Sequence, residues 1–121
     1  MLNRFVAIVA ELRTVNGDVV RGLDDPAGGT FDAAGHLDGV LPLASSLPLP
    51  PPADAYRLLH YVDPDSNTIF NAFQMDDLLS DLDVAARLAR TPQQRRGLDR
   101  LRVMARRCKD GVDLYLWFVG D

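Results

Sequence analysis

The chain has 121 residues, of which 47% are hydrophobic, and this length and composition predict one domain over 1–121 with a packed core. Its single cysteine excludes an internal disulfide, and two histidines are too few for a convincing zinc ligand set, so we expect no metal and no cofactor. The net charge of −4 divides into −9 over residues 1–86 and +5 over residues 87–121, which is not typical of a dedicated nucleic-acid binder.

The N-terminal residues 3–13 form a strong strand candidate, with apolar side chains on both faces as in a central strand. The Asn-Gly pair at 16–17 predicts a hairpin turn into residues 19–20. The apolar run at 5–10 is short for a signal peptide, and nothing approaches the roughly 18 apolar residues of a membrane span. We therefore expect a soluble, cytoplasmic protein with no membrane partner.

Residues 22–55 are rich in glycine and proline and predict a long loop without extended regular structure. Apolar residues spaced through this segment indicate that it packs on the body of the domain: Leu23, Phe31, Leu37, Val40, Leu41, Leu43 and Leu47. The proline run at 47–52 predicts an extended polyproline II conformation. It serves either as a rigid connector that covers a sheet edge or as a ligand for an aromatic groove in a partner.

Residues 56–71 predict a β-hairpin, with strands at 56–62 and 67–71 joined by an aspartate- and proline-rich turn. Asp63, Asp65 and Asn67 imitate the first half of an EF-hand calcium loop. Thr68 stands where that loop requires glycine, so a plain turn is the better interpretation.

An amphipathic helix is predicted over residues 72–90. Its apolar residues recur at three- and four-residue steps and form one stripe: Met75, Leu78, Leu79, Leu82, Ala85, Ala86 and Ala89. Asn71 and Gln74 have the spacing of a capping box, which explains both residues without a ligand. An anion site at this helix start is the alternative, and it lacks a glycine-rich loop. Acidic residues are expected largely off the stripe: Asp76, Asp77, Asp81 and Asp83.

A second helix is predicted over residues 92–109. Thr91 suits the N-cap, Pro92 the first helical position, and Gln94 can bond back to the cap. One face is apolar and carries Leu98, Leu101, Ala105 and Cys108. This pattern predicts a buried, unreactive thiol. Much of the remaining surface is basic: Arg95, Arg96, Arg100, Arg102, Arg106 and Arg107. These arginines are solvated, pair with the acids of the first helix, or contact phosphate. Gly111 is expected to end the helix.

The alternation at residues 112–119 predicts a well-buried strand. We expect an α+β fold with an antiparallel sheet built from 3–13, 56–62, 67–71 and 112–119. The two helices pack on one face of this sheet, and the long Pro/Gly-rich loop runs beside it.

The stretches "DSNTIFNAFQMDDLLSDL" and "LYLWFVGD" resemble small single-domain proteins of GC-rich bacteria, and the likeness covers residues 60–121. In outline the chain also resembles immunity proteins of bacterial polymorphic toxin systems, which are small, acidic and cytosolic. This resemblance implies a non-enzymatic inhibitor and supplies no catalytic residues.

Three hypotheses for the function follow. The first is a non-enzymatic protein-interaction domain, an immunity- or antitoxin-like inhibitor of a toxin. Its candidate contact residues are Asp76, Asp77, Asp81, Asp83, Arg95, Arg96, Arg100 and Arg106. The second is a small ligand-binding protein or enzyme with a pocket under the 22–55 loop, using His36, His60, Asp63 and Tyr56. The third is an RNA contact through Arg95, Arg96, Arg100 and Arg106, although this helix has no base-stacking aromatic residue.

Overall fold

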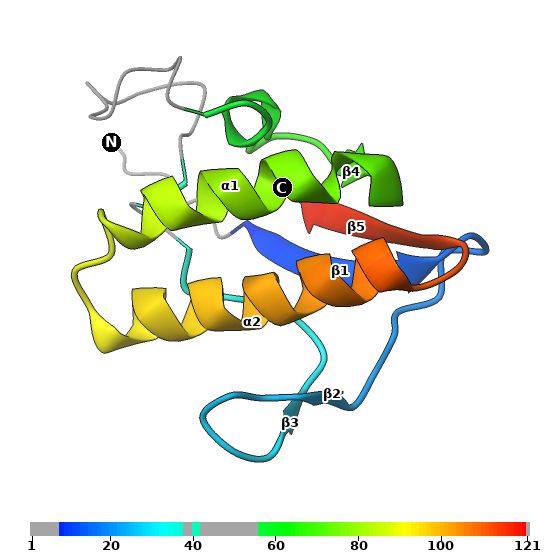
Figure 1. Cartoon of the computed structure of the whole chain (residues 1–121), viewed down its shortest axis with the longest axis horizontal. Helices are drawn as coiled ribbons and strands as arrows, with labels where there is room; N and C mark the ends of the chain where they lie inside the picture. The colour runs from blue at the N-terminus through cyan, green and yellow to red at the C-terminus, as the bar shows by residue number, and fades with distance from the viewer. Residues whose placement is uncertain (1–7, 38–39, 42–55, 121) are drawn as a thin grey trace.

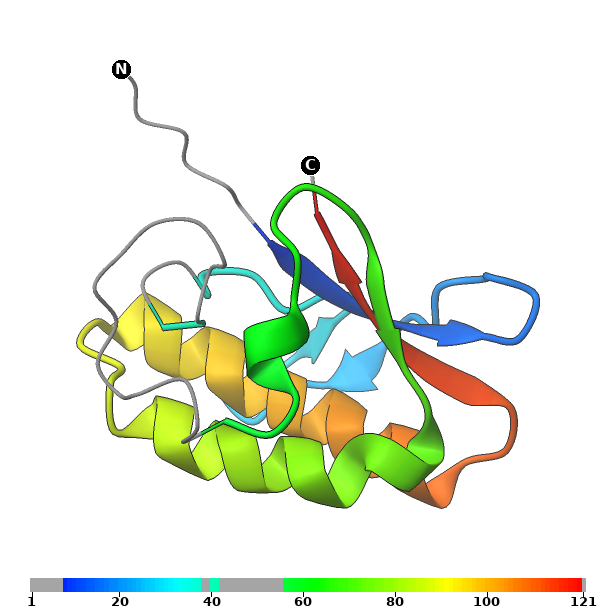
Figure 2. The ribbon, with the colours of Figure 1, turned by 90° about the horizontal axis from the view of Figure 1, so that it is seen from above.

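The computed structural model describes residues 8–37, 40–41 and 56–120. It has two layers, a three-stranded antiparallel sheet and two antiparallel helices that cover one face of it (Figures 1 and 2). The predicted α+β class with two helices on one face is confirmed. The predictions for Leu43 and for the proline run at 47–52 lie outside the described residues.

The main sheet has the strand order β1-β5-β4. The central strand β5 (Leu114–Val119) pairs with β1 (Val9–Thr14) along its whole length, and with the short edge strand β4 (Thr68–Phe70) on its other side. Val9 lies opposite Val119, so the first and last strands of the chain are neighbours. The described part of the predicted 3–13 strand, the return strand near 67–71 and the terminal strand are therefore confirmed.

The two faces of the sheet differ because successive side chains of a strand point to opposite sides. The inner face is buried and carries Ala10, Leu12, Phe70, Leu116 and Phe118. On the outer face, the guanidinium of Arg13 lies 4.2 Å from the centre of the Trp117 ring and also bonds to Glu11. This cation–π contact partly covers the tryptophan, since no helix lies on that side of the sheet in the described residues.

The predicted strand at 56–62 is wrong. The segment folds as a turn with one 3₁₀ helix, η2 (Leu59–Tyr61), and does not pair with the sheet. Tyr56, Leu59 and Val62 are its buried side chains. Their three-residue spacing matches the period of a 3₁₀ helix and not the two-residue period of a strand, which is the signal that the sequence interpretation missed.

The loop regions between β1 and residue 37 differ from the prediction in two ways. The turn at 16–17 is present, but beyond it only Val19 bridges back to Arg13, so no full hairpin strand forms. Further along, β2 (Leu23–Asp24) and β3 (Thr30–Phe31) form a short hairpin. In the described part of the 22–55 segment the apolar residues are buried, as predicted: Leu23, Phe31, Leu37, Val40 and Leu41.

Both helices begin at the predicted caps. A 3₁₀ turn, η3 (Ala72–Gln74), leads into α1 (Met75–Ala86), and the Gln74 side chain accepts the Asn71 N–H at 2.9 Å. The second helix, α2 (Pro92–Asp110), has a capping box from Thr91, whose hydroxyl accepts the N–H of the third helical residue. No helix in the described residues has the length and hydrophobicity to cross a membrane.

Gly111 and Gly97, at the end and in the middle of α2, lie where a larger side chain does not fit. Gly111 ends α2 as predicted, but at a φ of −91°, so a left-handed conformation is not the reason. A Cβ on Gly111 would lie 2.4 Å from the Leu114 side chain and 2.9 Å from the Arg107 carbonyl. A Cβ on Gly97 would lie 2.0 Å from the carbonyl oxygen of Gly35. The loop backbone thus packs directly on α2 at a position where only glycine fits.

Candidate interaction site

The structure places Asp81 in the interior, so its expected surface position is wrong. Its side chain is 1% exposed and accepts the backbone N–H groups of Arg57, Leu58 and Leu59 at 2.7–3.0 Å. These bonds hold the turn before η2 against α1. Asp81 follows Leu78 by three residues and precedes Ala85 by four, a spacing that would have placed it on the buried stripe.

The other three acidic candidates lie on the surface and are paired within the domain. Asp76 bonds to Lys109 at 2.7 Å, and Asp83 to Arg102 at 2.9 Å. Asp76 and Asp83 are seven residues apart on one helix, and Lys109 and Arg102 are seven residues apart on the other. This spacing is about two helical turns, so the two ion pairs connect the antiparallel helices at matching heights. The alternative that the arginines of the basic helix pair with the acids of the first helix is thereby confirmed at Arg102, and Lys109 forms a second pair of the same kind.

Asp77 does not take part in the ion pairs between the two helices. Its carboxylate bonds to the guanidinium of Arg57 at 2.8 Å. Both side chains are well exposed. The pair therefore adds little to stability on its own, since exposed ion pairs typically contribute 1 kcal/mol at most. Together, the paired acids leave the predicted acidic face of the first helix largely neutralised.

Arg100 is also used inside the domain. Its guanidinium bonds to Asp25, a carboxylate with 1% side-chain exposure, at 2.7 Å from Nη2 and 2.9 Å from Nε. Arg96 reaches the same carboxylate at 3.5 Å. Asp25 was missed as an important residue, although an Asp-Pro pair with two following glycines indicates a loop organised by its own side chain.

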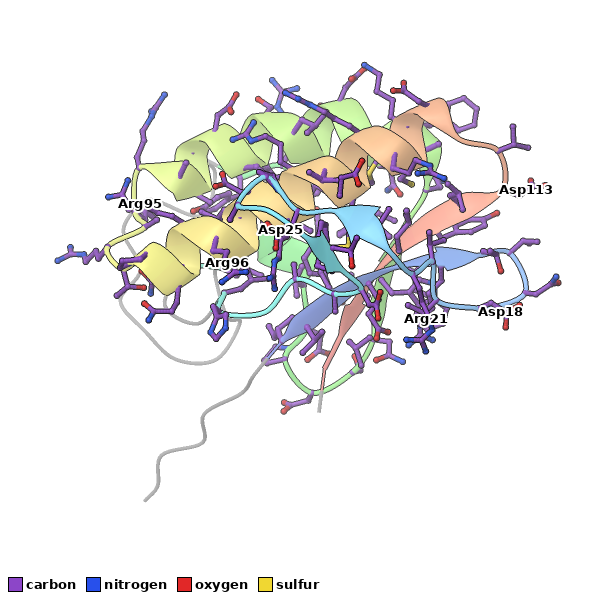
Figure 3. All side chains as sticks on the ribbon, turned by 90° about the horizontal axis from the view of Figure 1, so that it is seen from below. Asp18, Arg21, Asp25, Arg95, Arg96 and Asp113 are labelled. Carbon is purple, nitrogen blue, oxygen red and sulfur yellow. The ribbon has the colours of Figure 1, made fainter. Side chains whose placement is uncertain are left out.

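The remaining arginine candidates point outward. Arg95 is exposed and donates one bond to the Ala89 carbonyl, and Arg106 is exposed without an ion pair to any residue the structure describes. Arg96 keeps an exposed side chain despite its weak contact with Asp25. Figure 3 shows Arg95 and Arg96 at the start of α2. The candidate set is therefore divided, with five residues engaged in contacts that hold the fold and these three side chains exposed.

Of the four residues proposed for a pocket, the structure brings His60 and Tyr56 together. The Nδ1 of His60 lies 2.8 Å from the Tyr56 carbonyl, and a carbonyl only accepts, so this nitrogen carries the proton. His36 is exposed, with a positive φ of 58°. The carboxylate of Asp63 organises its own turn by accepting the Asp65 N–H and the Ser66 hydroxyl. The proposed turn role of this aspartate is confirmed.

Two buried groups have raised pKa values. Burial raises the pKa of the Cys108 thiol to about 11, and the thiol donates to the Leu114 carbonyl at 3.4 Å. The predicted burial of this cysteine is confirmed. Burial, followed by the nearby charge of Asp81, raises the pKa of Tyr56. Its hydroxyl is the one buried side-chain polar atom in the described part of the chain without a hydrogen-bond partner.

One exposed apolar residue stands out from this surface. Phe73, in η3, is 96% exposed, although the caps on either side of it are well formed. Val112, in the turn after α2, is 83% exposed. The helix pattern places Phe73 off the buried stripe, and this apolar residue outside the stripe is the signal that the sequence interpretation overlooked.

Comparison of the chain with protein-family models, with curated proteins and with solved structures found no match.

Proposed function

We propose that this protein is a protein-interaction domain that binds its partner with the end of the molecule where Phe73 and Val112 lie. The observation that carries this proposal is the nearly complete exposure of Phe73. Burying a phenylalanine side chain contributes about 1.5–3 kcal/mol, and contiguous apolar patches with a polar rim mark protein-binding surfaces. Aromatic anchors of this kind dominate many interfaces.

The resemblance to immunity proteins suggests the kind of partner. An inhibitor of a bacterial toxin needs a rigid surface that covers the toxin's site, and the capped helix start holds Phe73 on such a surface. Because the acidic residues of α1 are neutralised by ion pairs, the proposed contact with the partner is placed at Phe73 and not at these acids. Asp76, Asp77 and Asp83 are engaged in ion pairs, so a partner would have to displace these pairs before using them.

The test is quantitative binding to the purified products of the adjacent reading frames, by isothermal titration calorimetry. We expect one product to bind, and Phe73→Ser to weaken it at least about tenfold, as for an aromatic hot spot. Tyr61→Ser is the matched control, because Tyr61 is an exposed aromatic on η2, away from this end (Figure 2). Equal binding by the Phe73 variant and the wild type would reject the proposed site.

The substitution Phe73→Ser tests binding without disturbing the fold, because the Phe73 side chain makes few contacts in the domain. Surface substitutions of this kind change the free energy of unfolding by about 0.5 kcal/mol or less. We therefore expect the same urea midpoint for this variant and the wild type. A loss of binding by this variant then reports on the contact with the partner and not on a change in the fold.

A further inference from the structure

Three segments meet at the end of the molecule that carries Phe73. The start of α1 lies beside the end of α2, because Asp76 of the first bonds to Lys109 of the second at 2.7 Å. The turn at 15–18 follows β1 at the point where Thr14 pairs with Leu114 at the start of β5. Figures 1 and 2 show all three segments at the same end. Val15 in this turn adds a third apolar residue, 60% exposed.

Unpaired carboxylates surround these apolar residues. Asp18, Asp110 and Asp113 are exposed, and none forms an ion pair with another described residue. Figure 3 shows Asp18 and Asp113 at one end of the molecule and Arg95 at the other. The turns at 15–18 and 110–113 contain no basic residue.

The basic residues in the last turns of α2 do not form ion pairs with the acids of this rim in the described residues. Lys109 is paired with Asp76, and this contact raises the pKa of Lys109. Arg106 and Arg107 lie about one helical turn before the end of α2, three and four residues from Asp110. Beyond them, α2 has one more basic residue, Lys109, which is the one paired with Asp76. In the connection between the helices, at the opposite end, Arg87 and Arg90 are exposed and form no ion pair with another described residue.

We infer that the acidic end binds a protein surface with an apolar pocket and a rim of lysine or arginine. This inference rests on the proposed function and names the chemistry of the partner. Phe73 supplies the apolar anchor, and Asp18, Asp110 and Asp113 attract the basic rim, which increases the rate of association and selects against acidic surfaces. A second copy of the chain fits less well, because a two-fold contact centred on Phe73 brings like carboxylates together.

The experiment uses two labelled peptides of identical length that form amphipathic helices. One has leucine on one face and lysine on the other, and its counterpart has glutamate in place of lysine. Fluorescence anisotropy measures the affinity of each for the full chain, and amide shifts of Ala72 and Val112 locate the contact. The variants are Phe73→Ser, the pair Asp18→Asn with Asp113→Asn, and the control pair Asp24→Asn with Asp99→Asn, which removes the same charge elsewhere.

We expect the lysine peptide to bind and shift both amides, and the glutamate peptide to bind at least about tenfold more weakly. The Asp18/Asp113 pair should weaken lysine-peptide binding about threefold to tenfold, with a smaller salt dependence, while the control pair leaves it unchanged. Equal binding of both peptides, or equal losses in the two charge pairs, overturns the basic-rim inference but leaves the Phe73 site standing. Unchanged binding by Phe73→Ser rejects the site itself. Self-association that Phe73→Ser abolishes would assign the surface to a second copy.

Discussion

Nη2 of Arg100 lies 2.7 Å from Oδ2 of Asp25, although 75 positions separate the two residues in the chain. This contact fastens the β2–β3 hairpin to the middle of α2. The loop itself also holds the Asp25 carboxylate in position, because this carboxylate accepts the Ala27 N–H at 3.0 Å. The same guanidinium lies 5.4 Å from the centre of the Phe31 ring.

The Asp25 contact predicts an acid-dependent loss of stability. The Ala27 N–H, followed by the bond from Arg100, lowers the pKa of Asp25 below its usual 3.8, against the opposing effect of burial. A lowered pKa means that the stabilisation is present above about pH 4 and is lost as the pH falls through the folded-state value. We therefore expect Asp25→Asn to lower the urea midpoint at about pH 7, and to differ much less from the wild type at about pH 2.

Asp24→Asn is the control for that experiment, because the Asp24 side chain is exposed and makes no ion pair with another residue in the described ranges. Its midpoint should follow the wild type at both pH values. A gap between Asp25→Asn and the wild type that stays constant from neutral to acid pH would contradict the charge-based explanation.

Asp81→Ala should destabilise the domain by about 3 kcal/mol. The substitution leaves the N–H groups of Arg57, Leu58 and Leu59 without their acceptor, and hydrogen bonds to a buried charged group contribute about 1.5–3 kcal/mol. Asp77→Ala removes an exposed ion pair on the same helix and should cost less than about 1 kcal/mol. Urea unfolding monitored by circular dichroism measures both. Similar costs for the two variants would show that Asp81 does not anchor the turn.

Gly97→Ala should destabilise the protein by about 1–3 kcal/mol, the usual cost of overpacking. Alanine has a higher helix propensity than glycine by about 1 kcal/mol, so the substitution would stabilise the protein if space for the methyl group were available. The contact at 2.0 Å with the Gly35 carbonyl makes the steric term the larger one. Gly35→Ala meets no atom within 4 Å and should leave the thermal midpoint nearly unchanged. A stabilised Gly97 variant would mean that the loop does not pack here.

Cys108 should resist thiol reagents in the native state. Its pKa of about 11 leaves very little thiolate at about pH 8, and the side chain is fully buried. We expect reaction with a disulfide reagent at least about a hundredfold slower than in urea-unfolded protein, measured by absorbance. A native rate close to the unfolded rate would show that the C-terminal part of α2 opens frequently.

Local sequence patterns were sufficient to predict most of the secondary structure. The caps at Asn71 and Thr91, the apolar stripes of both helices and the alternation of β5 were all readable, because each depends on residues within one or two turns. The segment at 56–62 failed for a physical reason. Its shape depends on the Asp81 carboxylate, which is more than twenty residues away and satisfies three N–H groups that a strand would have paired with a neighbour.

The charges of the chain were visible in its sequence, but their availability was not. The sequence by itself determined an acidic first part, a basic second helix and enough apolar material for one core. Only the tertiary structure decided that Asp81 and Arg100 are used internally, and that Phe73 remains exposed. The reason is that an ion pair or a buried carboxylate forms between groups brought together in space, and the distance along the chain does not reveal which groups meet.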